Sequence, residues 1–108
     1  MYSKIFYSRT IDEKEVRINQ NEIVYMKVID KYIDIFTYKD VYSVRGSLDN
    51  ILSNLGDNFF RISRNIIVNF NNVSSITDKE VEVFGKERFI ISRRRRKAVI
   101  ESYRNLSM

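Results

Sequence analysis

Residues 32–45 read Tyr32-Ile33-Asp34-Ile35-Phe36-Thr37-Tyr38, then Lys39-Asp40, then Val41-Tyr42-Ser43-Val44-Arg45. Both longer runs alternate with a period of two and are rich in β-branched and aromatic residues, which is typical of strands. The polar pair between them predicts a tight turn. The sequence therefore predicts a β-hairpin over this stretch, which decides the fold class.

Short runs of the same kind lie on both sides of the hairpin. They predict further strands at residues 5–7, 16–18, 23–28, 66–68, 73–76, 81–84 and 88–91. Many short, closely spaced strands indicate antiparallel sheets packed against one another. We therefore expect a mainly β fold, with helices covering an edge or an end.

Two segments have helical spacing instead. Ser47 is a candidate N-cap for a short internal helix, and Gly56 is expected to follow that helix in the left-handed conformation. The apolar face of this helix is predicted to be core, and it comprises Leu48, Ile51, Leu52 and Leu55. Ser92 is a second candidate N-cap, at the start of a C-terminal helix. The buried stripe of that helix would comprise Val99, Ile100, Tyr103 and Leu106.

The composition limits the classes of function. A chain of 108 residues that is 44% hydrophobic predicts one folded domain over residues 1–108. It has no cysteine and no histidine, which excludes disulfides, the usual zinc sites and histidine-based nucleophile activation. No apolar run approaches the ~18 residues of a membrane helix, and the first residues lack the apolar segment of a secretory signal. We expect a cytoplasmic domain that does not cross a membrane and needs no cofactor or metal.

Positive charge is concentrated in the second half of the chain. Residues 1–58 carry a net charge of −1, whereas residues 59–108 carry +6, for a total of +5. Eleven of the nineteen cations are arginine, whose planar fork suits phosphate and guanine. This asymmetry favours one surface that faces a polyanion over lysines that merely solubilise the protein.

An arginine run, Ser92-Arg93-Arg94-Arg95-Arg96-Lys97, begins the expected C-terminal helix. The alternative interpretation is a solvated charged face. Cations in the first turn of a helix, however, lie at the positive end of its dipole, which is unfavourable by roughly 0.3–1 kcal/mol each. A bound anion reverses the sign of that interaction, so the run favours phosphate binding.

A second basic cluster lies within Phe59-Phe60-Arg61-Ile62-Ser63-Arg64-Asn65-Ile66-Ile67-Val68-Asn69. Arg61, Ser63, Arg64 and Asn65 form a polar insertion between apolar stretches, as expected of a loop between strands. Arg64 and Asn65 are central and should reach outward, whereas Arg61 could equally pair with a carboxylate. Lys31 lies between the predicted strand that ends near residue 29 and the one that begins at residue 32, and it is a further candidate to contact the polyanion.

These motifs resemble the LytTR domain. The resemblance rests on residues 59–69, Asn72-Val73, Ser92-Arg93-Arg94-Arg95, Gly46-Ser47-Leu48 before a helix, and Glu22-Ile23-Val24-Tyr25-Met26. It extends from about residue 10 to 105, with the motifs in the order and spacing of the family. It implies elongated antiparallel β-sheets and the DNA-binding output domain of a bacterial two-component response regulator. The chain would then be either a stand-alone regulator or the output domain of a longer protein.

The resemblance also implies roles for individual residues. Loops would enter successive major grooves, with base contacts from Arg64 and Arg94 and a further contact near Lys31. Asn65, Arg93 and Arg95 would contact the DNA backbone. The sequence departs from the family at Ser63, where histidine is common, and at Asn65, where serine is usual. These departures leave undetermined which base the loop contacts. Binding to promoter direct or inverted repeats, with a homodimer on the DNA, would follow the family pattern.

Other functions were weighed against sequence-specific binding of duplex DNA. An RNA or single-strand binding module could use the fourteen aromatic residues as stacking platforms, although their alternation suits a core. A metal-dependent nuclease could use Asp12, Glu13 and Glu15, but no second acidic cluster accompanies them. A protein-binding adaptor is a third alternative. We expect a transcription regulator without enzymatic activity.

Overall fold

The computed structural model describes residues 4–106, so residues 1–3 and 107–108 of the expected domain lie outside the described part. The described residues form ten strands in three antiparallel sheets, two α-helices and three short 3-10 helices. The strands are β1 (Ile5–Arg9), β2 (Glu15–Asn19), β3 (Ile23–Ile29), β4 (Tyr32–Thr37), β5 (Val41–Val44), β6 (Phe59–Ser63), β7 (Ile66–Asn69), β8 (Val73–Ile76), β9 (Glu80–Val83) and β10 (Arg88–Ile90). The helices are η1 (Gln20–Glu22), α1 (Leu48–Leu52), η2 (Phe70–Asn72), η3 (Arg93–Arg95) and α2 (Arg96–Leu106).

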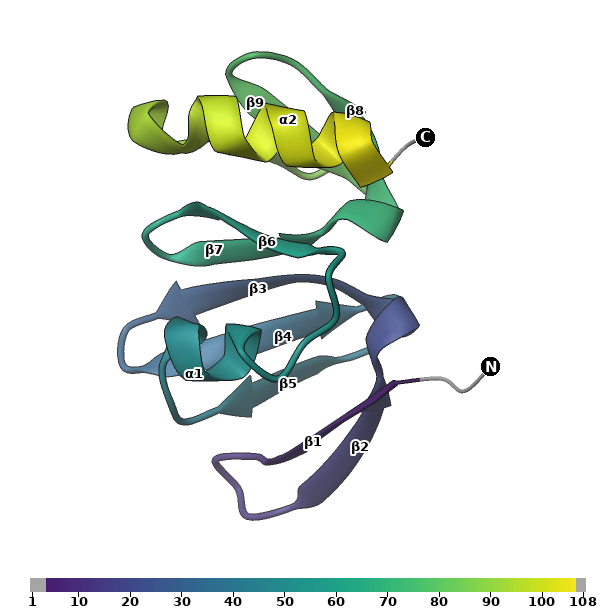
Figure 1. Cartoon of the computed structure of the whole chain (residues 1–108). Coiled ribbons are helices and arrows are strands. Elements are labelled where there is room, and N and C mark those ends of the chain that lie inside the picture. The colour runs from purple at the N-terminus through teal and green to yellow at the C-terminus, as the bar shows by residue number, and fades with distance from the viewer. Residues whose placement is uncertain (1–3, 107–108) are drawn as a thin grey trace.

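The central sheet has the strand order β5-β4-β3-β7-β6. The β1–β2 hairpin adjoins its β5 edge, where Thr10 bridges Val44, and a β10-β9-β8 sheet lies at the other end of the molecule with α2 (Figure 1). The described part measures 39 × 36 × 25 Å along its principal axes. Within these residues, neither α-helix has the length and apolar character required to cross a membrane. The predicted mainly β class, with antiparallel sheets, one internal helix and a C-terminal helix, is confirmed.

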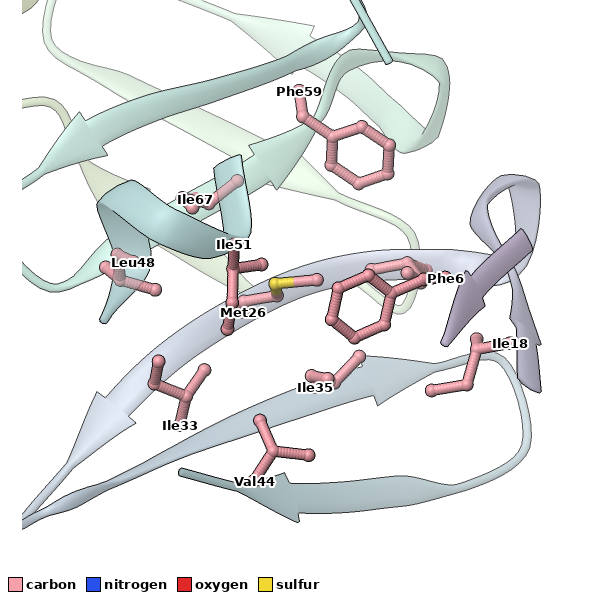
Figure 2. Packing of buried hydrophobic residues seen from close by; sticks show 11 residues of the cluster. Phe6, Ile18, Met26, Ile33, Ile35, Val44, Leu48, Ile51, Phe59 and Ile67 are labelled. Carbon is pink, nitrogen blue, oxygen red and sulfur yellow. The ribbon is translucent and has the colours of Figure 1, made fainter. Parts of the chain in front are cut away.

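Side chains that alternate along the central strands form two hydrophobic clusters on opposite faces of the central sheet. Met26 and Ile67 belong to the first cluster, which α1 covers, whereas their neighbours Tyr25 and Val68 pack into the second, beneath α2 and the three-stranded sheet. The first cluster, most of which Figure 2 shows, comprises Phe6, Ile18, Ile23, Met26, Ile33, Ile35, Val44, Leu48, Ile51, Phe59 and Ile67. The second comprises Val24, Ile62, Val68, Phe70, Val81, Val83, Phe89, Ile91 and Val99. The period of two in the sequence thus separates two cores.

The buried amide of Asn69 connects the central sheet to its surroundings. Its side chain is fully buried, and its Nδ2 donates to the carbonyl oxygens of Ile23 at 2.8 Å and Gln20 at 3.3 Å. Its Oδ1 accepts from the backbone N–H of Asn71 at 3.0 Å and from Asn58 Nδ2 at 2.5 Å. All its polar capacity is therefore used inside the protein, which is how a buried amide avoids a desolvation penalty.

The predicted internal helix forms, but it ends differently from the expectation. Ser47 is its N-cap and accepts from the backbone N–H of Asn50 at 3.2 Å, as predicted. Gly56, however, has no left-handed φ, and the helix ends at Leu52, so this expectation was wrong. Gly56 instead lies in a tight environment, because its N–H donates to Gln20 Oε1 at 2.9 Å and an added Cβ would lie 3.0 Å from Asn58 Oδ1, which would have to shift slightly.

The C-terminal helix also departs from the prediction in two respects. Ser92 occupies the N-cap position but makes no side-chain capping bond, and the chain enters α2 through the 3-10 turn η3. Val99 is buried and Tyr103 packs edge-on against Phe70, as the expected stripe requires. Leu106 is 46% exposed and does not belong to that stripe.

Candidate nucleic-acid interface

Three loops that carry predicted site residues lie on the same side of the molecule. β3 and β7 are antiparallel neighbours, with Lys27 paired to Ile66, so the β3–β4 and β6–β7 turns lie at the same end of the central sheet. The N–H of Val28 donates to the carbonyl of Asn65 at 2.9 Å, which ties the β6–β7 turn to β3. Figure 1 shows that the start of α2 lies on this side too, opposite the two labelled chain ends.

The β6–β7 turn consists only of Arg64 and Asn65, and both residues are exposed. The polar insertion expected over residues 61–65 is therefore shorter than predicted, because residues 61–63 continue β6. A register irregularity between Arg61 and Ser63 on β6 allows polar residues to continue the strand while Ile62 stays buried. Ser63 is half-buried beside Ile66.

The arginine run is held beside this turn by backbone contacts. The N–H of Ser92 donates to the carbonyl of Ile62 at 2.8 Å, and the N–H of Arg95 donates to the carbonyl of Ser92 at 2.9 Å. Arg96 Nε donates back to the carbonyl of Ile91 at 3.1 Å. These bonds fix where η3 begins, so the side chains of residues 93–95 emerge next to β6 and its turn.

Side chains from both basic segments line one open pocket of about 520 Å³. Its lining comprises Arg61, Arg64, Ser92, Arg94 and Arg95. Within residues 4–106, no ion pair joins Arg64 or Arg94 to a carboxylate. Segments about thirty residues apart in sequence thus bring four guanidinium groups together, and we name this site the arginine pocket.

Arg61 has a different environment from the other three arginines. It pairs with Asp49 of α1, and its Nη2 donates to the carbonyl of Arg64 at 2.5 Å. Its side chain is 23% exposed, whereas that of Asp49 is 81% exposed. The sequence left open whether Arg61 reaches outward or pairs with a carboxylate. In the structure it pairs with Asp49, and it also holds the backbone of the β6–β7 turn.

The arginine pocket carries positive charge that the protein does not fully neutralise. Burial lowers the pKa of the Arg95 guanidinium, and the positive charges of Arg94 and Arg61 lower it further. Three buried polar atoms around the pocket have no hydrogen-bond partner within the described part of the chain, namely Arg61 Nε, Ser92 Oγ and Arg95 Nε. Buried polar groups normally have a hydrogen-bond partner, so these atoms are donors that lack an acceptor beside the arginines.

The predicted residues Lys31, Asn65 and Arg93 do not line the arginine pocket. Arg93 is exposed on η3, and Asn65 is exposed next to Arg64. Lys31 is exposed in the two-residue β3–β4 turn, where the preceding Asp30 has a positive φ of 55°. These residues extend the basic surface away from the pocket, Lys31 along the end of the central sheet and Arg93 along η3.

Two residues of the site were not predicted as such. Ser92 was predicted only as a cap, and Asp49 was not singled out at all, although it neutralises Arg61. Nothing in the local sequence identifies Asp49 as a partner of Arg61, since the contact depends on α1 covering the central sheet next to β7. Asp49 does lie in the first turn of a helix, where an acidic residue is common.

Asp12 and Glu15 of the β1–β2 hairpin have side-chain partners nearby. Tyr7 donates its hydroxyl hydrogen to Glu15, Thr10 does the same to Asp12, and Asp12 lies 3.6 Å from Lys14 Nζ. The Thr10 hydroxyl lowers the pKa of Asp12. Across residues 4–106, no three acidic side chains are grouped as a metal site would require.

Comparison with known proteins identifies the family. A solved structure of the LytTr DNA-binding domain of a protein described as a methyl-accepting/DNA response regulator from Bacillus cereus is similar, with a TM-score of 0.78 over 94% of this chain and 97% of that chain. At 20% identity this likeness concerns the fold alone. A search of curated proteins gave no match. The protein-family model for the LytTr DNA-binding domain matches residues 13–103. The chain therefore belongs to the LytTR family of DNA-binding domains.

Proposed function

We propose that this domain binds double-stranded DNA in a sequence-specific manner, as the output domain of a bacterial transcriptional regulator. The observation that carries the proposal is the arginine pocket, where Arg64 and Arg94 lie together on one side of the fold and form no ion pair with a carboxylate of residues 4–106. Guanidinium groups in such an arrangement can form bidentate hydrogen bonds to guanine or to phosphate oxygens. The proposed role is binding alone, in the cytoplasm, without catalysis or a cofactor.

Exposure supports a division of roles within this surface. Arg64 is on the tip of a turn and Arg94 is exposed on η3, so both can reach base edges. Arg95 is half-buried and cannot extend as far, which suits contact with the DNA backbone. Exposed Asn65 and Arg93 border the pocket and would add backbone contacts.

The positions of the loops suggest how the grooves are occupied. Arg64 and Arg94 share one pocket, so we place them in the same major groove, close to one another on the DNA. Lys31 lies on a different turn along the same side and would contact the DNA beyond that groove. The described part measures up to 39 Å, which is comparable to the roughly 34 Å turn of B-DNA, and contacts in successive major grooves are part of this proposal.

The aromatic residues favour a duplex over a single strand as the ligand. Stacking platforms must be exposed, yet Tyr25 stacks on Phe36 and Phe60 stacks on Phe70 inside the protein. Tyr38 and Phe84 are exposed, but they pack edge-on against each other. Tyr7 is the other exposed aromatic residue of residues 4–106, so few faces remain there for bases to stack on.

Selection of bound duplexes from a random pool tests this proposal. We expect a preferred sequence to emerge and to bind at least about a thousandfold more tightly than scrambled duplex at physiological salt. The affinity should fall linearly with salt on a logarithmic plot, since backbone contacts release counterions. Tighter binding of single-stranded DNA or RNA of the same sequence would favour the alternative module and contradict the proposal.

Paired sites are the expected arrangement on promoters. We propose that the selected sequence recurs as a direct or inverted repeat in its promoters and that two copies of the domain occupy the two repeats. Titration of a duplex holding one or two copies of the selected site, followed by sedimentation, should give complexes with one and two domains. A single domain on the doubled site at saturation would exclude paired binding.

A further inference from the structure

We infer that Asp49, in the first turn of α1, is a specificity-determining residue of the DNA-binding surface. Its carboxylate holds Arg61, and Arg61 in turn holds the β6–β7 turn that presents Arg64. Asp49 is therefore a positioning residue, without a DNA contact of its own. The inference rests on the proposed function and deepens it, because it assigns part of the base preference to a carboxylate on another element.

Two consecutive contacts connect α1 to the tip of the β6–β7 turn. Asp49 pairs with Nη1 of Arg61, and Nη2 of the same guanidinium donates to the carbonyl oxygen of Arg64 at 2.5 Å. The planar fork of arginine fixes the angle between its two Nη groups, so anchoring one of them orients the other. Asp49 thus restrains the peptide group between Arg64 and Asn65, next to the point where the Arg64 side chain leaves the backbone.

The two carbonyl groups of this turn are held in different ways. The carbonyl of Asn65 accepts from the backbone N–H of Val28 at 2.9 Å, a contact that belongs to the sheet. The carbonyl of Arg64 is held by the side chain of Arg61. A long side chain restrains a turn only when its own end is fixed, since it otherwise retains much rotamer freedom. Asp49 supplies that fixed end, so the position of Arg64 depends on α1.

The charge of Asp49 supports a role in specificity over one in affinity. Its side chain is 81% exposed, and within residues 4–106 it is the one carboxylate in an ion pair with an arginine that lines the pocket. An exposed carboxylate beside a DNA-binding surface repels phosphate, so Asp49 lowers the affinity for every duplex alike. A residue that does so while fixing a base-reading arginine raises the ratio of specific to non-specific binding.

Asp49 also stabilises the arrangement of the arginines themselves. Burial lowers the pKa of the Arg95 guanidinium, and the positive charges of Arg94 and Arg61 lower it further, whereas the negative charge of Asp49 raises it. Asp49 therefore offsets the repulsion among the arginines of the pocket. Without Asp49, Arg61 would still be repelled by its neighbours but would lose the anchor that opposes this repulsion.

Nitrogen-15 relaxation measured without DNA tests the positioning step. The N–H of Asn65 shares a peptide group with the carbonyl of Arg64, so its order parameter reports how firmly Arg61 holds the turn. We expect that order parameter to fall from about 0.85 toward about 0.6 in Asp49→Ala. If the amide spectrum shows that Asp49→Ala does not fold, Asp49→Asn, which keeps the shape of the side chain, replaces it. An unchanged order parameter at Asn65 would overturn the inference.

Glu82→Ala is the matched control for both measurements. It removes the same charge and breaks a pair of the same kind, with Arg88 at 3.1 Å, and neither residue lines the pocket. The order parameter of Asn65 should therefore stay at its parent value. A fall in Glu82→Ala equal to that in Asp49→Ala would overturn the inference, because the effect would then not depend on the contact with Arg61.

Affinities for the single-base variants of the selected duplex test the effect on specificity. Arg64→Ala and Arg94→Ala first identify the positions at which each arginine discriminates between bases. Asp49→Ala should lower discrimination about tenfold at the position of Arg64 and leave that of Arg94 unchanged. Its affinity for scrambled duplex should rise about threefold at low salt, since a repulsive charge has been removed. Glu82→Ala should leave both quantities unchanged.

Rescue by the conservative variant separates positioning from a general loss of stability. Asp49→Glu retains the carboxylate and should preserve the discrimination that Asp49→Ala loses. Equal losses at both base positions, or weaker binding of Asp49→Ala to scrambled duplex, would overturn the inference while sequence-specific binding by the parent domain left the proposed function standing. A parent domain with no preference for any duplex would overturn the proposed function, and the role of Asp49 in specificity with it, even if Asp49→Ala loosened the turn.

Discussion

Arg61 and Arg64 are three residues apart, but the fold places their side chains in different environments. Arg61 is largely buried, pairs with Asp49 and donates to the carbonyl of Arg64, whereas Arg64 is exposed at the tip of the turn. The first arginine therefore positions the second. This relation explains why the loop needs two arginines even though one of them is turned toward the protein.

The positioning role of Arg61 predicts that charge alone cannot replace it. Arg61→Lys keeps the positive charge, but an ammonium group lacks the planar fork that reaches Asp49 and the Arg64 carbonyl together. We expect the free energy of unfolding to fall by roughly 1–2 kcal/mol, and base discrimination by the β6–β7 turn to decrease. Urea denaturation and binding to the selected duplex measure the two effects.

Arg88→Lys is the matched control for this substitution. Arg88 also pairs with a carboxylate, at 3.1 Å from Glu82, but its side chain is 65% exposed. The substitution there should change the unfolding free energy by less than about 0.5 kcal/mol and leave DNA binding unaltered. Equal effects of the two substitutions would show that Arg61 has no positioning role.

The buried amide of Asn69 is expected to contribute to the stability of the fold. Asn69→Ala removes a fully buried amide whose Oδ1 accepts from the N–H of Asn71 and from Asn58 Nδ2. We expect a loss of about 2–3 kcal/mol of unfolding free energy, measured by urea denaturation. Asn71→Ala, in the exposed part of the same 3-10 turn, should cost less than about 0.5 kcal/mol. A loss below 1 kcal/mol for Asn69→Ala would contradict the stabilising role of this amide.

At the scale of the elements, alternation in the sequence was sufficient to predict most strands. The hairpin of β4 and β5 and the strands of the N-terminal half follow directly from the period of two, apart from small shifts in their ends. The continuation of β6 through residues 61–63 was missed, because Arg61 and Ser63 look like loop residues until their partners are known. The environment of Gly56 was missed for the same reason, since it depends on Asn58 and Gln20, which lie close to this glycine only in the folded protein.

The length of the β6–β7 turn predicts how sensitive DNA binding is to an insertion. Two residues, Arg64 and Asn65, connect the strands, so an inserted Gly-Gly pair between them would displace Arg64 from the arginine pocket. We expect affinity for the selected duplex to fall about tenfold or more, which is within the contribution of one bidentate arginine contact. Fluorescence anisotropy with labelled duplex measures this loss.

The same insertion after Gly85 is the control, because that residue lies in the turn between β9 and β10 and already has a positive φ of 87°. This turn holds none of the residues that line the pocket. DNA affinity should remain within about twofold of the parent domain, a difference of roughly 0.4 kcal/mol. If both insertions weakened binding alike, the effect could not be assigned to the position of Arg64.

At the scale of the whole molecule, the central sheet separates two cores and brings distant loops to one side. The sequence predicted that Arg64 and Arg94 meet on one side of the molecule, and both line one pocket, but it did not predict that Arg61 and Ser92 line the same pocket. That proximity depends on the bond between the N–H of Ser92 and the carbonyl of Ile62 and on the antiparallel pairing of β3 with β7. Such long-range contacts are set by packing, and local patterns do not encode them.

The absence of histidine from the sequence predicts that DNA binding does not depend on pH near neutrality. Burial and neighbouring cations lower the pKa of Arg95, but a guanidinium starts so far above neutrality that it stays protonated. The lowered pKa of Asp12 keeps that carboxylate ionised throughout the same range. Affinity for the selected duplex, measured at constant ionic strength, should therefore be flat between about pH 6 and 7.5. A tenfold change in affinity across this pH range would contradict this expectation, because it would require a group that titrates near neutrality.

The central claim is that Arg64 and Arg94 act together from one pocket on neighbouring bases of duplex DNA. It is tested most directly by measuring the affinities of Arg64→Ala, Arg94→Ala and Arg93→Ala for every single-base variant of the selected duplex. Arg64→Ala and Arg94→Ala should each lose about 1–3 kcal/mol of discrimination between bases, at positions a few base pairs apart. Arg93→Ala should weaken all duplexes equally and reduce the salt dependence by about one counterion. Equal losses on every duplex for all three variants, or affected positions a full helical turn apart for Arg64 and Arg94, would contradict it.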